Sequence, residues 1–136
     1  MRLLLDTHVL IWCATDNANI GTKAREIIVD PVSEVFVSIV SFWEMAIKLR
    51  IGKLVAPDLG EVMTAMAGLG IGVLPLSLAH IHELLRLPIL PDHRDPFDHQ
   101  IIAQAIADDL VLLTNDRNAA RYPVKRMTCL GEFVGP

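Results

Sequence analysis

The sequence predicts an α/β domain of three layers, in which a central parallel sheet of four or five strands lies between two layers of helices. Short apolar runs alternate along the chain with longer segments of helical periodicity, and this alternation is typical of βαβ units. Hydrophobic residues make up 52% of the chain, in keeping with strands that are buried on both faces. With 136 residues, the chain suits one domain with a proper core and is too short for two comfortable ones.

Five segments are expected to form strands because apolar and β-branched residues run through them. The clearest are "RLLLD" at the start of the chain and "EVFVS", which combines valine with phenylalanine. The weakest is the last, "VKRMT". The strands are expected over residues 2–6, 34–38, 71–75, 110–114 and 124–128.

Helices are expected between these strands, and proline and glycine mark several of their ends. Asp30 precedes Pro31, and the residue before a proline avoids the helical region, so the second helix is expected to end there. Gly52 is expected to end the third helix and Pro88 the fifth. The helical segments are 7–14, 21–30, 41–52, 58–70, 77–87, 95–109 and 117–122.

Charge and composition exclude several classes of protein. The formal net charge of −4 argues against nucleic-acid binding through bulk positive potential, although a local basic strip of Lys48, Arg50 and Lys53 is a candidate for RNA phosphate contacts. No apolar stretch approaches the ~20 residues of a membrane span, and no signal peptide is expected. The spacing of Cys13 and Cys129 is not that of a disulfide framework, so we expect a cytoplasmic protein with reduced thiols.

Several acidic side chains are expected to converge on one edge of the sheet. Asp6 closes the first strand and Asp116 follows the fourth, and ligands of parallel sheets bind beyond the strand ends where the strand order reverses. Like charges at close range raise each other's pKa unless a cation neutralises them. An all-oxygen set suits Mg²⁺ or Mn²⁺ rather than zinc. The hypothesis is a divalent-metal site formed by Asp6, Glu44, Asp98 and Asp116.

Helix capping is the alternative explanation for these acids, and the sequence leaves it open. Ser41 and Glu44 have the spacing of a capping box. Asp95 is placed as an N-cap with Asp98 in the first turn, and Asp116 precedes a short helix. If the acids only cap helices, the chain is a non-catalytic interaction or RNA-binding module.

Other enzyme classes fit the sequence less well. A structural zinc site is disfavoured because His80 and His82 are two apart on an expected helix and point to different faces. A Mg²⁺-dependent phosphatase of the haloacid-dehalogenase type needs a second aspartate two residues after the first, where this chain has His8. A response-regulator receiver needs an aspartate at the end of a central strand, where this chain has Ser38.

Three stretches of the sequence resemble one family in the same order and with similar gaps. They are "LLLDTHVLIW", "VSIVSFWEMAIKLRIGKL" and "DPFDHQIIAQAIADDLVLLTND". They resemble the PIN-domain ribonucleases, and among these the VapC-type toxins of toxin–antitoxin modules are the most similar. The resemblance extends from Arg2 to about Arg126, so we expect a single PIN-like domain over residues 1–136.

The resemblance implies a metal-dependent endoribonuclease that uses Mg²⁺ or Mn²⁺. The family's acidic quartet corresponds to Asp6, Glu44, Asp98 and Asp116. Asp95 matches an extra acid that often precedes the third member, and Thr7 and Thr114 match small polar positions beside the metal. His99 stands where similar segments carry arginine, which leaves the role of that side chain open.

The same resemblance implies partners. A cognate antitoxin is expected to lay its C-terminal segment across the acidic groove, and the protein is expected to form a homodimer. Aromatic residues are only 5% of the chain, so single-stranded RNA would find few stacking platforms. The resemblance to the family implies recognition of a structured RNA such as tRNA by its shape.

Overall fold

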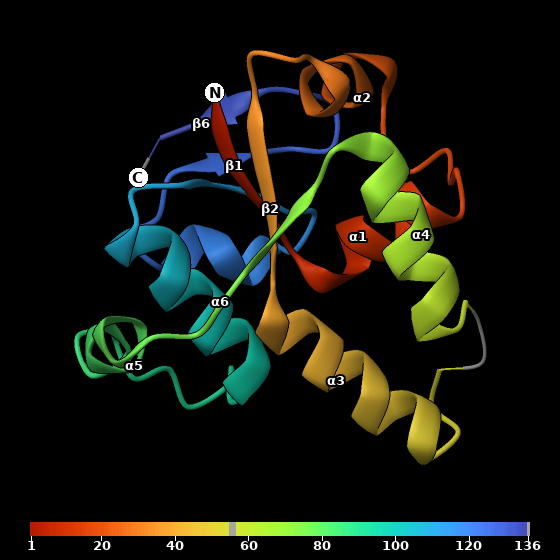
Figure 1. The fold of residues 1–136 in the computed structure, drawn as a ribbon. Coiled ribbons are helices and arrows are strands. Elements are labelled where there is room, and N and C mark those ends of the chain that lie inside the picture. The colour runs from red at the N-terminus through yellow and green to blue at the C-terminus, as the bar shows by residue number, and fades with distance from the viewer. Residues whose placement is uncertain (55–56, 136) are drawn as a thin grey trace.

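One sheet organises the chain in a computed structural model that describes residues 1–54 and 57–135 (Figure 1). Within those residues the sheet has six strands in the order β3-β2-β1-β4-β5-β6. The strands are β1 (Arg2–Leu5), β2 (Glu34–Ser38), β3 (Gly72–Leu74), β4 (Val111–Leu113), β5 (Arg126–Met127) and β6 (Phe133–Val134). All pairs are parallel except β5 with β6. The sheet thus has one strand more than expected, because a two-residue C-terminal strand is too short to leave an apolar pattern.

The helices occupy all seven segments expected from the sequence, with ends that differ by a few residues. They are α1 (Thr7–Ala14), α2 (Thr22–Val29), α3 (Ile39–Arg50), α4 (Leu59–Leu69), α5 (Leu78–Leu84), α6 (Pro96–Ala107) and the 3₁₀ helix η1 (Arg117–Arg121). Asp30 ends α2 as expected, and Gly52 follows α3 with a φ of 75°. α5 ends at Leu84, one turn earlier than expected from Pro88.

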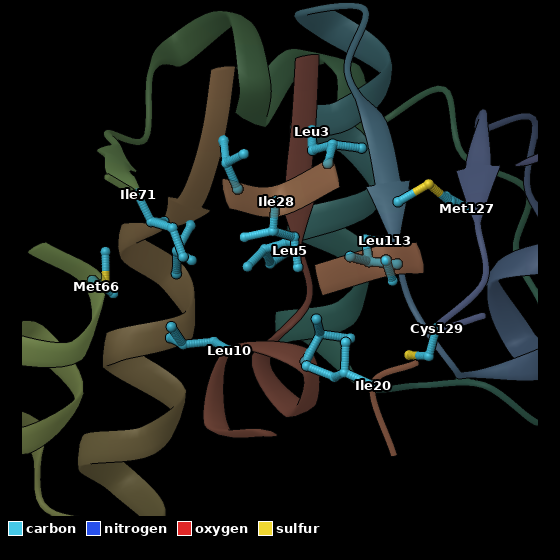
Figure 2. Close-up of a cluster of buried hydrophobic side chains, with 14 of the residues drawn as sticks. Leu3, Leu5, Leu10, Ile20, Ile28, Met66, Ile71, Leu113, Met127 and Cys129 are labelled. Carbon is cyan, nitrogen blue, oxygen red and sulfur yellow. The ribbon is translucent and has the colours of Figure 1, made fainter. Parts of the chain in front are cut away.

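Side chains that alternate along β1 fill two separate cores and confirm the three-layer arrangement. Leu3 and Leu5 are fully buried in the cluster that includes Leu10 of α1 and Ile28 of α2 (Figure 2). Leu4 points to the opposite face, into the cluster that includes Ile101 of α6. Each fully buried leucine contributes roughly 1.5–3 kcal/mol to stability. The sheet is therefore held from both faces, as its apolar strands require.

The passage from β2 into α3 has no loop. Ser38 is both the last residue of β2 and the N-cap of α3, and its Oγ accepts a hydrogen bond from the Val40 amide. The predicted capping box of Ser41 with Glu44 is wrong, because the helix begins earlier, at Ile39. Ser41 lies inside α3, where it is fully buried.

The sequence also predicts reduced cysteine thiols and no membrane-spanning segment. Cys13 and Cys129 are free, and burial raises the pKa of each thiol to about 11. Within the described part of the chain, none of the helices combines the length and the apolar character that a bilayer crossing requires.

Candidate metal centre

The register of the sheet brings two polar residues together at its carboxyl edge. Leu5, the last residue of β1, pairs with Leu113, the last residue of β4. The residues that follow, Asp6 and Thr114, therefore lie side by side, and Thr114 Oγ1 donates a hydrogen bond to Asp6 Oδ2. The strand order reverses here, since the chain runs from β1 toward β2 and β3 on one side and reaches β4 and β5 on the other. Such a switch point is where open parallel sheets bind their ligands.

Asp6 has two roles at this point, one for each carboxylate oxygen. Its Oδ1 caps α1 by accepting the amide proton of Val9 at 2.9 Å, and its Oδ2 faces Thr114. Burial raises the pKa of Asp6 above its ordinary value and the charge of Asp116 raises it further, whereas hydrogen bonds from Thr114 and Val9 lower it. The capping and metal-binding interpretations of Asp6 are thus compatible.

Asp116 reaches the same edge from the loop after β4. Its amide donates to Thr114 Oγ1 at 3.0 Å, and its Oδ1 caps η1 by accepting from the Asn118 amide at 2.9 Å. The predicted cap is therefore confirmed. Its Oδ2 accepts no hydrogen bond from any residue that the structure describes, so this oxygen remains available to a cation.

Asp98 approaches from the first turn of α6. As expected from the sequence, Asp95 is the N-cap of this helix, with Pro96 at its first position. Asp95 Oδ1 accepts hydrogen bonds from the amides of Phe97 and Asp98. Burial, followed by the charge of Asp95, raises the pKa of Asp98 to about 6. A carboxylate at such a site is destabilised when it is charged, unless a cation is close.

A small cavity lies between these carboxylates. Asp6, Asp98, Asp116 and Thr114 form its polar side, and its volume is about 20 Å³. The apolar side consists of Ile101, Ile102, Leu112 and Ala119. This volume holds one water molecule or one ion of similar size.

Glu44 lies beside this cavity and does not line it. It is 2% exposed, and its two oxygens accept hydrogen bonds from Thr7 Oγ1 at 2.7 Å and Lys48 Nζ at 2.8 Å. Oxygens of Glu44, Asp95 and Asp98 all lie within 4.8 Å of one another. Asp98 therefore joins two acidic groups, one at the cavity and one around Glu44.

The three residues of the basic strip have different surroundings, because Lys48 is paired with an acid of the site whereas Arg50 and Lys53 are exposed. Lys48 forms an ion pair with Glu44, and the hydrogen bond with Glu44 raises the pKa of Lys48. Arg50 and Lys53 are exposed at the C-terminal end of α3. Their contact with RNA stays a prediction.

One residue of the site was missed in the sequence. His93 is buried, and its Nε2 lies 3.2 Å from Asp98 Oδ2. His93, Asp98 and Asp116 each offer an atom within 4.8 Å of the other two. The close spacing of His93 and Asp98 in "HRDPFD" is the one indication of this contact in the sequence. The two helical histidines behave as expected, since His80 is buried and His82 is exposed.

The donor set fits a hard divalent cation. Three carboxylates from three separate segments border one cavity, and burial raises the pKa of two of them, Asp6 and Asp98. Bringing these charges together destabilises the fold unless a cation neutralises them. Oxygen ligands of this kind select Mg²⁺ or Mn²⁺ over softer metals.

Fold and site together define an α/β protein with a cluster of acidic residues at the switch point of its sheet. The family model described as "PIN domain" matches residues 3–125, and the chain belongs to this family. The family expected from the sequence is thereby confirmed.

Two solved structures share the fold. The crystal structure of VapBC2 from Rickettsia felis, bound to a DNA fragment from their promoter, matches with a TM-score of 0.69 and 14% identity, covering 94% of this chain and 98% of that chain. VapBC-1 from nontypeable Haemophilus influenzae matches with a TM-score of 0.60 and 19% identity, covering 89% of this chain and 91% of that chain. No curated protein sequence matches the chain.

Proposed function

We propose that the protein is a metal-dependent endoribonuclease and the toxin of a toxin–antitoxin pair. The observation that carries the nuclease proposal is the meeting of Asp6, Asp98 and Asp116 at one cavity, where burial and neighbouring carboxylates raise the pKa of Asp6 and of Asp98. Membership of the PIN domain family supports it. The fold shared with two VapBC structures supports the toxin role.

Asp6, Asp98 and Asp116 would hold the cation, Mg²⁺ or Mn²⁺. Such a cation supplies positive charge for the scissile phosphate and makes a nearby water molecule more acidic. The protein's own part is to keep these carboxylates in place before the cation arrives. Thr114 does this for Asp6, and the helix cap of Asp95 does it for Asp98.

Glu44 would orient the attacking water. Thr7 and Lys48 each hold one of its oxygens, so the carboxylate has a fixed direction beside Asp98. With water as the nucleophile, the ribose 2′-hydroxyl takes no part in the reaction. The products would be a 5′-phosphate and a 3′-hydroxyl, and a 2′,3′-cyclic phosphate would contradict this mechanism.

The proposal also includes an RNA substrate and two protein partners. The substrate would be a structured RNA such as tRNA, contacted by the exposed side chains of Arg50 and Lys53. A cognate antitoxin and a second copy of the chain would cover apolar surface, and the whole would act in the cytoplasm. Exposed apolar side chains support protein partners, since Leu78, Leu85 and Ile89 are each more than four-fifths exposed.

RNA cleavage tests the nuclease proposal. Purified protein should cleave RNA with Mg²⁺ or Mn²⁺, and EDTA or Asp6→Asn should abolish cleavage. Asn is as good an N-cap as Asp, so this variant removes charge and keeps the cap of α1. Asp58→Asn is the matched control, because Asp58 caps α4 and lies outside the acidic cluster.

Two other outcomes would replace the proposal. Tight RNA binding without cleavage would identify a non-catalytic module of the same fold. Phosphorylation by acetyl phosphate would indicate a phosphatase or phosphoacceptor domain. The toxin role has its own test, since expression should arrest growth and a small co-encoded protein should relieve the arrest.

A further inference from the structure

We propose that His93 is a positioning residue that holds the Asp98 carboxylate ready for a cation. This inference rests on the proposed function, because it assigns a role at the same site. The role belongs to the side chain of a loop residue between α5 and α6, outside the four acids expected from the sequence.

His93 connects Asp98 to a second buried polar group. The imidazole is 6% exposed, and its Nε2 lies 3.2 Å from Asp98 Oδ2. Its Nδ1 lies 2.7 Å from the hydroxyl oxygen of Tyr122, which is 3% exposed. The three side chains form a chain of hydrogen bonds from the apolar core to the acidic cavity.

The direction of these hydrogen bonds follows from counting protons. The Tyr122 hydroxyl has one proton to donate, and His93 Nδ1 is its partner among the described residues. If Nδ1 accepts that proton, the neutral ring carries its own proton on Nε2 and donates it to Asp98. Among the described residues, the opposite assignment leaves a buried hydroxyl proton without an acceptor. It also sets the Nε2 lone pair against a carboxylate, and both are unfavourable. Burial also raises the pKa of the Tyr122 hydroxyl, which keeps its proton in place.

The same count of protons distinguishes a positioning role for His93 from direct binding of the cation by His93. A metal ligand needs a bare nitrogen, and that nitrogen would have to be Nε2, the atom beside Asp98. Nδ1 would then carry the proton and donate it to Tyr122, whose own proton would lack a partner in the described part of the chain. The structure therefore favours an imidazole that orients the ligand Asp98 over one that binds the cation.

The ring of His93 is itself held in place by His99. His99 Nε2 donates to the backbone carbonyl of His93 at 2.8 Å. The two rings meet edge to face with their centroids 4.8 Å apart. This contact gives the histidine at position 99 a structural role, which the comparison with arginine-containing segments left open.

Asp98 needs such a support because its side chain is about one-third exposed. Its Oδ2 is held by His93, whereas Oδ1 receives no hydrogen bond from the residues that the structure describes. Holding one oxygen fixes the plane of the carboxylate and leaves the other oxygen for the cation. Loss of partners of this kind typically lowers metal affinity 10- to 100-fold.

Manganese binding to the purified full chain tests the inference. His93→Leu removes the donor, and His93→Gln keeps an N–H at the position of Nε2. His80 provides the matched control, since it is equally buried and its Nε2 contacts the carboxylate of Asp108 at 2.9 Å, a pair that belongs to no acidic group of the site. Affinities come from titration calorimetry, and pulsed electron paramagnetic resonance of bound Mn²⁺ reports whether a nitrogen is directly coordinated.

We expect His93→Leu to weaken Mn²⁺ binding at least tenfold, His93→Gln to restore it to within about threefold, and His80→Leu and His80→Gln to leave it unchanged. The wild-type Mn²⁺ signal should lack coupling to a directly bound ¹⁴N. A nitrogen coupling that disappears in His93→Gln would overturn positioning in favour of ligation. Unchanged affinity in His93→Leu would overturn the inference outright.

Failure of the inference is distinct from failure of the proposed function. Wild-type protein that cleaves RNA, together with a His93→Leu variant that binds Mn²⁺ equally well, overturns the inference alone. Wild-type protein that cleaves no RNA contradicts the proposed function, and weaker Mn²⁺ binding by His93→Leu would still support the role of His93.

Discussion

Thr114 Oγ1 donates a hydrogen bond to Asp6 Oδ2, joining residues 108 positions apart in the chain. The contact follows from the register of two neighbouring parallel strands, which end opposite each other at Leu5 and Leu113. It fixes the first carboxylate of the site before any cation is present. The acidic cluster therefore starts at the carboxyl edge of the two central strands, β1 and β4.

The charge of Asp98 should make the metal-free protein less stable than it would otherwise be. Its raised pKa of about 6 lies roughly two units above the usual value of 3.8, and each unit corresponds to about 1.4 kcal/mol. After a discount for partial exposure, we expect Asp98→Asn to raise the free energy of unfolding at pH 7.5 by about 1–2 kcal/mol. Urea denaturation in EDTA measures this. Asp58→Asn should change stability by less than about 0.5 kcal/mol, and a destabilised Asp98→Asn would contradict the prediction.

The stability of the metal-free protein should fall as the pH rises from 4 to 7. Because the folded pKa of Asp98 is raised, the folded state binds more protons than the unfolded state between about pH 4 and 6, so the free energy of unfolding decreases with pH there. The raised pKa of Asp6 acts in the same direction. Denaturation across this range should show the slope in wild type and a smaller one in Asp98→Asn. Saturating Mn²⁺ at pH 7 should restore the lost stability, and a slope of opposite sign in EDTA would refute the assignment.

Removal of Lys48 should strengthen cation binding. Its ammonium lies 2.8 Å from Glu44 Oε2, and the charges of Asp95 and Asp98 also act on it. Two charges several ångströms apart near a protein surface interact by on the order of 1 kcal/mol, so we expect Lys48→Met to raise Mn²⁺ affinity about fivefold. Calorimetry of Lys53→Met, which should bind as wild type does, provides the control. Weaker binding by Lys48→Met would mean that holding Glu44 in place matters more than repulsion.

Arg50 and Lys53, the exposed residues of the basic strip, should determine part of the salt dependence of RNA binding. Each phosphate contact adds about 0.7–0.9 to the slope of log affinity against log salt concentration. In the Asp6→Asn background, which prevents cleavage, Arg50→Gln with Lys53→Gln should reduce that slope by about 1.5. Lys23→Gln with Arg86→Gln removes the same charge from other exposed positions. Equal slopes in the two double variants would remove the strip from the RNA-binding surface.

Much of this site could be predicted from the sequence because its acids follow recognisable strands and helices. Asp6 and Asp116 come after apolar runs, and parallel strands place such residues at one edge. Asp95 and Asp98 follow the rules for helix N-termini, and the structure confirms the positions that these rules predict.

The contacts that could not be predicted lie where no periodicity exists. His93 stands in a loop and reaches Tyr122, 29 residues away, after a 3₁₀ helix. No periodic pattern in the local sequence relates two residues that are this far apart in the chain. The predicted capping box was wrong for a related reason: Ser38 is both the last residue of β2 and the N-cap of α3. The N-cap therefore lies about one turn before the expected Ser41, and Ser41 is buried inside the helix.

Anomalous diffraction from crystals of the Mn²⁺-soaked protein tests the central claim most directly. We expect a strong anomalous peak in the cavity, about 2.1–2.2 Å from oxygens of Asp6, Asp98 and Asp116. If crystals soaked at saturating Mn²⁺ have no peak there, while these carboxylates keep only the hydrogen bonds that they make within the protein, then the three acids do not bind a shared cation and the nuclease proposal is contradicted.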